Sequence, residues 1–101
     1  MKLTRLEEQF KRVASIQGGV FLLRAKDAIR FVEACRDVGI RISGLEGFRI
    51  DGDRIQPLQE HSVDYGGSER QDHETSLLFL GSREDSGVWF EVVTDDRGGE
   101  S

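Results

Sequence analysis

Along this 101-residue chain, the spacing of apolar residues alternates between the period of a helix and the period of a strand. This alternation is the sequence feature that most constrains the fold. From Leu3 to Val13, apolar side chains recur every three or four positions, which predicts an amphipathic helix. Thr4 and Glu7 have the spacing of a capping box, in which each side chain satisfies a free backbone N–H of the other. Gly18 and Gly19 are expected to stop this helix.

A strand and a second helix are predicted next. Val20 to Leu23 is short and apolar on both faces, which is typical of a strand inside a sheet. Residues 25–38 place apolar side chains on one side and charged ones on the other, so they predict a helix. Gly39 fits its left-handed C′ position, with Ile40 folding back over the last turn. Cys35 lies on the apolar side, where we expect it to pack inertly.

Alternating apolar residues from Ile40 to Ile50 then predict a half-buried strand. Gly44 and Gly47 interrupt it, and glycines inside a strand indicate a bulge or the close approach of another backbone. Asp51-Gly52 is predicted to form a two-residue type I′ turn. The return strand, 54–56, is expected to be short and to lie at a sheet edge, because Pro57 cannot donate to a ladder.

The last third of the chain is less regular. Residues 58–67 are predicted to form a polar loop. Ser68 and Gln71 could cap a helix over 69–82, although the bunched apolar run Leu77–Leu80 fits a strand equally well. Val88–Thr94 predicts the final strand. Residues 95–101 are expected to be a frayed acidic tail.

Together these elements predict an α+β fold: an N-terminal helix followed by a βαββαβ two-layer sandwich with a mainly antiparallel sheet, as in split-βαβ or ferredoxin-like proteins. Residues 1–94 make one domain. A single cysteine excludes an internal disulfide and multi-cysteine zinc motifs. No apolar run is long enough to cross a membrane or follows a signal-peptide pattern, so we expect a cytoplasmic protein without membrane contact.

Charge divides the chain unevenly. Residues 1–50 hold ten Lys and Arg against six Asp and Glu, whereas residues 51–101 hold four against thirteen. Such an acidic half repels phosphate backbones and attracts basic partners. We therefore expect a basic protein partner and no direct binding of nucleic acid. Ordinary solubility is the alternative explanation of the same charge.

The densest polar cluster is Glu60, His61, Asp64 and Tyr65. A carboxylate beside an imidazole could serve as a general base or bind a metal. These side chains could instead hydrogen-bond the loop backbone, with Tyr65 as an anchor, or recognise a basic protein. No catalytic or phosphate-binding motif is present, so we predict no enzyme, no cofactor and no metal site.

The second face of the predicted sheet has its own composition. If all helices lie on one side, the other side carries Ser43, Leu45, Arg49, Trp89, Glu91 and Val93. An exposed Trp with aliphatic neighbours and an Arg is typical of an interface centre, for a partner or for a homodimer. If the N-terminal helix covers this face instead, Trp89 belongs to the core.

Three stretches resemble the immunity proteins that accompany secreted bacterial polymorphic toxins: AKDAIRFVEACRDVGIRISGLEGFRI, IQPLQEHSVDY and VWFEVV. The resemblance spans about residues 19–93 and is most specific at Gly44-x-x-Gly47-Phe48, at Pro57 and in the Glu60–Tyr65 segment. It implies a cytosolic inhibitor without catalytic activity that binds a cognate toxin domain, often a nuclease.

The sequence therefore predicts a small, acidic, non-catalytic protein-binding module, most specifically an immunity protein that neutralises a toxin domain. Two alternatives remain open: a small enzyme or ligand-binding domain that uses Glu60, His61 and Asp64, and a homodimeric structural or regulatory domain. The predicted partner-binding residues are Asp51, Asp53, Glu60, His61, Asp64, Tyr65, Glu69, Asp72, Glu74 and Trp89.

Overall fold

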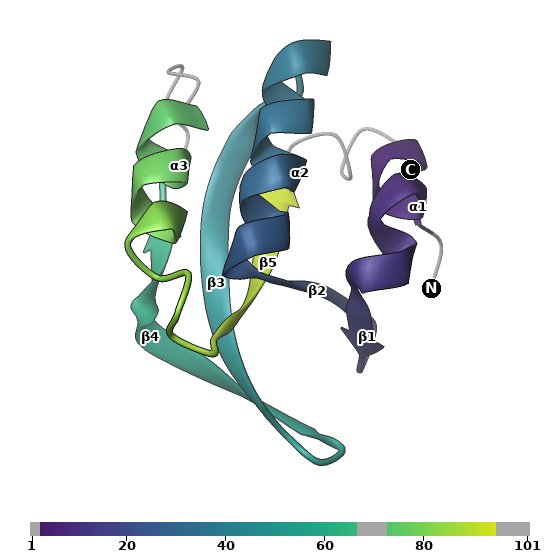
Figure 1. The fold of residues 1–101 in the computed structure, drawn as a ribbon, viewed down its shortest axis with the longest axis vertical. Coiled ribbons are helices and arrows are strands. Elements are labelled where there is room, and N and C mark those ends of the chain that lie inside the picture. Colours follow the sequence, from purple (N-terminus) through teal and green to yellow (C-terminus); the bar gives the residue numbers. More distant parts are fainter. Residues whose placement is uncertain (1–2, 67–72, 95–101) are drawn as a thin grey trace.

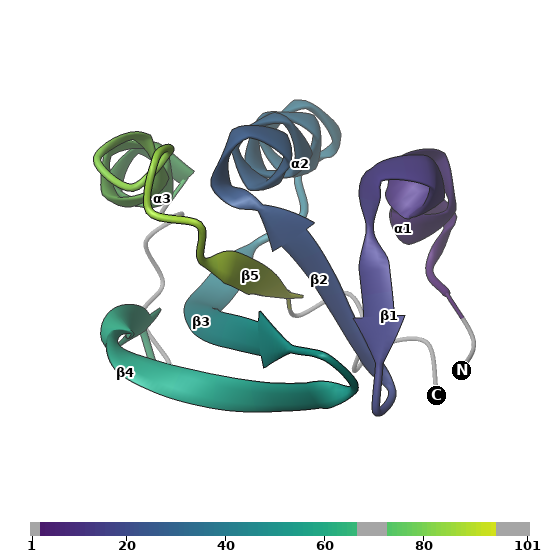
Figure 2. The ribbon, with the colours of Figure 1, turned by 60° about the horizontal axis from the view of Figure 1, so that its bottom comes forward.

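A computed structural model describes residues 3–66 and 73–94. It contains one antiparallel sheet with three helices on a single face of it (Figures 1 and 2). The α+β two-layer prediction is confirmed. The helical elements are α1 (Arg5–Phe10), the 3₁₀ helix η1 (Lys11–Val13), α2 (Ala25–Val38) and α3 (His73–Gly81), and the strands are β1 (Ser15–Gln17), β2 (Val20–Arg24), β3 (Ile42–Asp51), β4 (Arg54–Asp64) and β5 (Trp89–Thr94).

The N-terminal helix starts as predicted but ends early. The Thr4 backbone N–H donates to Glu7 Oε1 at 2.9 Å, and the Glu7 N–H donates to Thr4 Oγ1 at 3.1 Å, which completes the capping box. The helix stops at Phe10, however, and residues 15–17 form β1. Gly18 and Gly19 both have positive φ and join β1 to β2 as a two-residue hairpin loop. The Gly-Gly pair is therefore a hairpin signal here rather than a helix stop.

Helix α2 is bounded as the sequence predicts. Gly39 has φ 76°, and the Ile40 N–H donates to the Cys35 carbonyl at 2.8 Å, so the chain reverses over the last helical turn. Phe31 contacts Phe10 of α1 edge-on, with 5.2 Å between ring centroids. Cys35 is fully buried in the core, as predicted.

The strand order is β1-β2-β5-β3-β4, with every neighbouring pair antiparallel. Strands β2 and β3 are therefore parallel, with β5 between them, which is a split βαβ unit. In a ferredoxin-like sheet the third of these four strands would fill that central slot, whereas here the fourth does. Pro57 gives a physical reason: a strand that contains proline favours an edge, and β4 lies at the edge as predicted.

The β3–β4 turn is shifted by one residue from the prediction. Asp51 pairs with Arg54, so the loop residues are Gly52 and Asp53. Gly52 has φ 64°, while no described non-glycine residue has positive φ. Positive φ at the first loop position alone is the pattern of a type II′ turn, not of the predicted type I′ turn.

Residues 73–81 are helical, which settles the helix-or-strand alternative for the described part of that segment. Ser76 and Leu80 of α3 are fully buried against the sheet, whereas Leu78 is exposed. The predicted cap at Ser68 and Gln71 and the predicted tail at 95–101 lie outside the described residues. No helix in the described ranges has both the length and the apolar character needed to cross a membrane.

Candidate binding surface

One extra residue in β3 decides which side chains face the helices. Ile42 pairs with Thr94 and Gly44 with Val93, so Ser43 is a bulge in the ladder to β5. A bulge reverses the facing of every residue after it. Leu45 consequently lies in the core, and Phe48, which pairs with Trp89, lies on the open face. The prediction that Leu45 and Arg49 share a face with Trp89 is wrong for this reason.

Strand β4 contains a larger bulge where the sequence predicted a loop. Leu58 pairs with Gly47 and Val63 pairs with Leu45, so four residues of β4 lie opposite the single residue Glu46. The Ser62 hydroxyl closes the gap, accepting from the Gly47 N–H at 3.0 Å and donating to the Leu58 carbonyl at 2.8 Å. Most of the predicted polar loop is therefore a bulged strand that continues to Asp64.

Replacing Ser62 with alanine is expected to lower the free energy of unfolding by about 1–3 kcal/mol, because both backbone groups lose their hydrogen-bond partner. Thr75→Ala on α3 is the matched control, since Thr75 is exposed. Its expected effect is within about 0.5 kcal/mol. Chemical denaturation of both variants measures the difference. Equal stability of the two would show that Ser62 does not hold the bulge.

An aromatic row crosses four strands on the open face. Register pairs place Arg24 beside Trp89, Trp89 beside Phe48, and Phe48 beside Pro57. The Arg24 guanidinium lies 4.8 Å from the Trp89 ring centroid, within range of a cation–π interaction. Ile50 and Ile55 are paired on the same side and are half-buried. We call these residues the sheet patch: Arg24, Phe48, Ile50, Ile55, Pro57 and Trp89.

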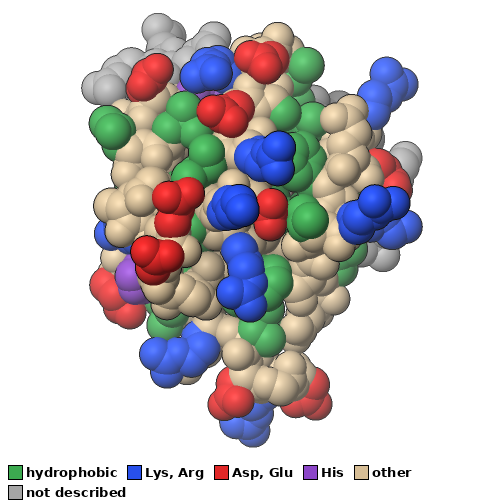
Figure 3. Space-filling view, viewed as in Figure 1, with side chains coloured by type: hydrophobic (Ala, Val, Ile, Leu, Met, Phe, Trp, Pro, Cys, Tyr) green, Lys and Arg blue, Asp and Glu red, His purple; other side chains and the backbone are tan. Residues whose placement is uncertain are grey.

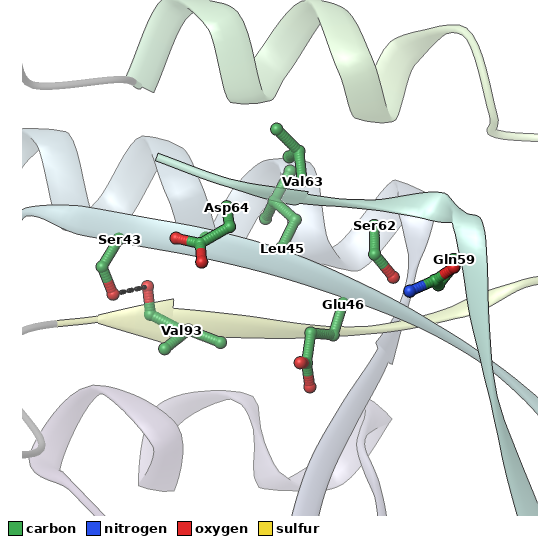
Figure 4. A pocket seen from close by; sticks show the side chains of 9 residues that line it. Ser43, Leu45, Glu46, Gln59, Ser62, Val63, Asp64 and Val93 are labelled. Atoms are coloured by element: carbon green, nitrogen blue, oxygen red, sulfur yellow. Dashed lines mark hydrogen bonds between the residues drawn. The ribbon is translucent and has the colours of Figure 1, made fainter. Parts of the chain in front are cut away.

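A pocket of about 420 Å³ adjoins the sheet patch on the same face. Gly44 lines it and is paired with Val93 on one side and with Asp64 on the other. In Figure 4 the Glu46 and Asp64 carboxylates extend to the same side of the β3–β4 pair. The Ser43 hydroxyl is already engaged with the Val93 carbonyl at 3.2 Å. We call this site the carboxylate pocket; Gln59 and Ser62 also line it.

The Glu60–Tyr65 segment does not converge on one site. His61 Nδ1 accepts a hydrogen bond from Arg83 Nε at 3.1 Å on the helix side of the sheet. Asp64 instead accepts from the Gly66 N–H at 2.8 Å and lines the carboxylate pocket on the other side. Tyr65 anchors the segment to α3 through a 2.9 Å hydrogen bond between its hydroxyl and Ser76. Glu60 is exposed.

The polar side chains of this segment therefore do not form a single cluster. Within residues 3–66 and 73–94, no group of three His, Cys, Asp or Glu side chains is placed to hold a metal ion. The second histidine, His73, is buried, and its Nε2–H donates to the Ile40 carbonyl at 2.7 Å. Both histidines therefore stabilise the α3 contacts.

Acidic residues gather on one side of the molecule. Figure 3 shows acidic side chains over α3 and its border, with basic side chains over the middle and the α1 side. Figures 1 and 2 place α3 above β4, at the opposite end of the sheet from α1 and β1. All the carboxylates of this region are exposed. We call them the acidic side: Glu60, Glu74, Glu84 and Asp85.

The predicted partner residues are thus divided. Asp51 and Asp53 lie at the tip of the β3–β4 hairpin, away from α3, and Trp89 lies on the open face. Glu69 and Asp72 lie outside the described residues. Glu46 and Arg24 were not among the predicted partner-binding residues. Register is the missing signal, since only strand pairing places Asp64 beside Gly44, two residues from Glu46, and Arg24 beside Trp89.

No known family model matches this chain, and neither the curated proteins nor the solved structures include a significant match.

Proposed function

We propose that this protein is a small, non-catalytic, cytoplasmic binding module that neutralises a basic protein partner, as an immunity protein neutralises its toxin. The acidic side is the observation that supports this most. None of the four acidic-side carboxylates forms an ion pair with another described residue, so the described part of the fold does not neutralise them. Exposed charges that the fold leaves unpaired remain available to a partner.

The single basic residue of α3 and the loop after it is held in place. Arg83 stacks on the Phe79 ring at 3.7 Å and donates from NH1 to the Phe79 carbonyl and the Ser82 hydroxyl, besides its contact with His61. Its guanidinium is thus turned inward onto α3 and β4. The acidic carboxylates around it then dominate the field that an approaching molecule meets.

A basic protein surface fits this field, and a nucleic acid does not. Clustered negative charge steers a positively charged protein to the surface and raises its association rate. A nuclease domain carries such a surface where it binds phosphates. Acidic side chains docked there would occupy the place of the substrate, which inhibits without any reaction.

The test compares two triple variants that raise the net charge equally from −5. Glu60→Gln, Glu84→Gln and Asp85→Asn neutralise the acidic side. Glu8→Gln, Glu33→Gln and Asp37→Asn neutralise exposed positions on α1 and α2. Each protein is immobilised, the recovered partner is identified, and its association rate is measured at low and high salt.

We expect the acidic-side variant to associate about 10-fold more slowly at low salt, with little difference at high salt, because screening removes the steering. The α1–α2 variant should behave as wild type. Co-expression with the partner should protect cells from it, and the protein alone should show no turnover. Equal rates for both variants, a partner without a basic surface, or no protection would contradict the proposal.

A further inference from the structure

The open face of the sheet has no helix layer among the described residues, although it carries large apolar side chains. Figure 2 shows α1, α2 and α3 together on the same side of the sheet. Trp89, Ile50 and Ile55 are half-buried and Pro57 is exposed on the uncovered side. An aromatic residue with aliphatic neighbours and a stacked arginine has the composition of an interface centre.

Along β3, successive rows of paired residues on this face differ in their side chains. The aromatic row contains Phe48, and the next row places Glu46 directly opposite Glu91. One row further, Gly44 lies between Val93 and Asp64. Along β3 the face therefore passes from an aromatic row to rows that carry the carboxylates of Glu46 and Asp64.

The polar groups that line the carboxylate pocket define what could fill it. The hydroxyls of Ser43 and Ser62 are both committed to backbone groups. Glu46 and Asp64 supply the charged acceptors of the lining, Gln59 supplies an amide and Val93 an apolar side chain. A complementary group therefore combines several N–H donors and a positive charge with an apolar stem. Arginine and lysine side chains have this construction.

We propose that the open face docks a segment of a protein partner that inserts an arginine or lysine side chain into the carboxylate pocket and lays adjacent apolar side chains on the sheet patch. The proposal rests on the proposed function in taking the partner to be a basic protein. It adds a second surface to the acidic side and names the side chains that this surface receives.

The experiment uses the position of Trp89, the only tryptophan of the chain, within the sheet patch. The full chain is titrated with an acetylated, amidated pentapeptide of alternating leucine and arginine, followed by tryptophan fluorescence and by backbone amide NMR shifts. The same peptide with citrulline in place of arginine keeps the shape and removes the charge. We expect the arginine peptide to bind about 10-fold more tightly than the citrulline peptide, with shifts concentrated in β3, β4 and β5.

Variants locate the site. Glu46→Gln with Asp64→Asn should reduce the affinity for the arginine peptide about 10-fold, to that of the citrulline peptide, and leaves Trp89 as the probe. Glu8→Gln with Glu33→Gln neutralises two carboxylates elsewhere and should change nothing. Equal affinity for both peptides, binding of neither peptide, or NMR shifts on the helices would each overturn the inference. So would sedimentation in which the unliganded chain is a dimer and the Trp89→Ala variant is a monomer.

The outcome separates this inference from the proposed function. If the acidic-side triple variant loses the partner while Glu46→Gln with Asp64→Asn binds it as wild type, the function stands and the open-face site is wrong. If no basic partner exists but the peptide docks as described, the site stands and the function is wrong.

Discussion

Gly47→Ala is expected to destabilise the protein by about 3 kcal/mol, at the upper end of what overpacking usually costs. A Cβ atom at this position would lie 2.6 Å from His61 Cβ, 2.7 Å from the His61 carbonyl oxygen and 3.1 Å from Val88 Cγ1. Because one of these atoms is backbone, a side-chain rotation cannot relieve the clash. β4 must move away from β3, which also stretches the Gly47–Ser62 hydrogen bond.

Two further glycines provide controls for that measurement. At Gly44 the nearest atom to an added Cβ is the Val63 carbonyl oxygen at 2.9 Å, so Gly44→Ala should cost less than Gly47→Ala. Gly81 ends α3 with nothing within 4 Å, and alanine there should be neutral or stabilise by up to about 1 kcal/mol. Thermal denaturation should rank the melting temperatures in the order Gly81→Ala, Gly44→Ala, Gly47→Ala. A Gly47→Ala protein as stable as Gly81→Ala would refute the close approach of β4.

Phe90→Ala is expected to lower the free energy of unfolding by about 3–5 kcal/mol, since it removes a fully buried aromatic ring from the core. The Phe90 ring packs edge-on against Phe79 of α3 at 6.3 Å between centroids. Its loss therefore also loosens α3, which carries Glu74 of the acidic side. At roughly 4–8 °C per kcal/mol for a domain of this size, the melting temperature should fall by more than about 12 °C.

The neighbouring residue supplies the comparison for Phe90. Trp89→Ala removes a larger ring, but this ring lies half-buried on the open face, so its expected cost is about 1–2 kcal/mol. Phe90→Leu, with an expected cost near 1.5 kcal/mol, keeps the test usable if the alanine variant does not fold. A larger loss for Trp89→Ala than for Phe90→Ala would mean that the two faces of β5 are assigned the wrong way round.

Locally encoded elements were predictable from residues close in the chain. The Thr4–Glu7 capping box, the Gly39 reversal at the end of α2 and the edge position of the Pro57 strand each depend on contacts or donors within a few residues. Strand β1 was missed because the same Gly-Gly pair can end a helix or turn a hairpin. Local spacing alone does not distinguish these two outcomes.

The candidate site was less predictable. The Glu60–Asp64 segment has the composition of a polar loop, yet Ser62 holds it against β3 as a bulged strand. Its members then point to different sides, His61 to Arg83 and Asp64 to the carboxylate pocket. A bulge depends on the register between strands, and hydrophobic alternation within one strand does not reveal an inserted residue.

The sequence by itself determined the class of fold, the main helices and strands, and the concentration of acidic residues in the second half, because periodicity, capping and charge are read from neighbouring positions. Only the tertiary structure decided that β5 lies between β2 and β3, that the Ser43 bulge turns Leu45 inward and Phe48 outward, and that Glu46 and Asp64 line the same pocket. These arrangements arise from hydrogen bonds between residues far apart in the chain, whose pairing no local pattern specifies.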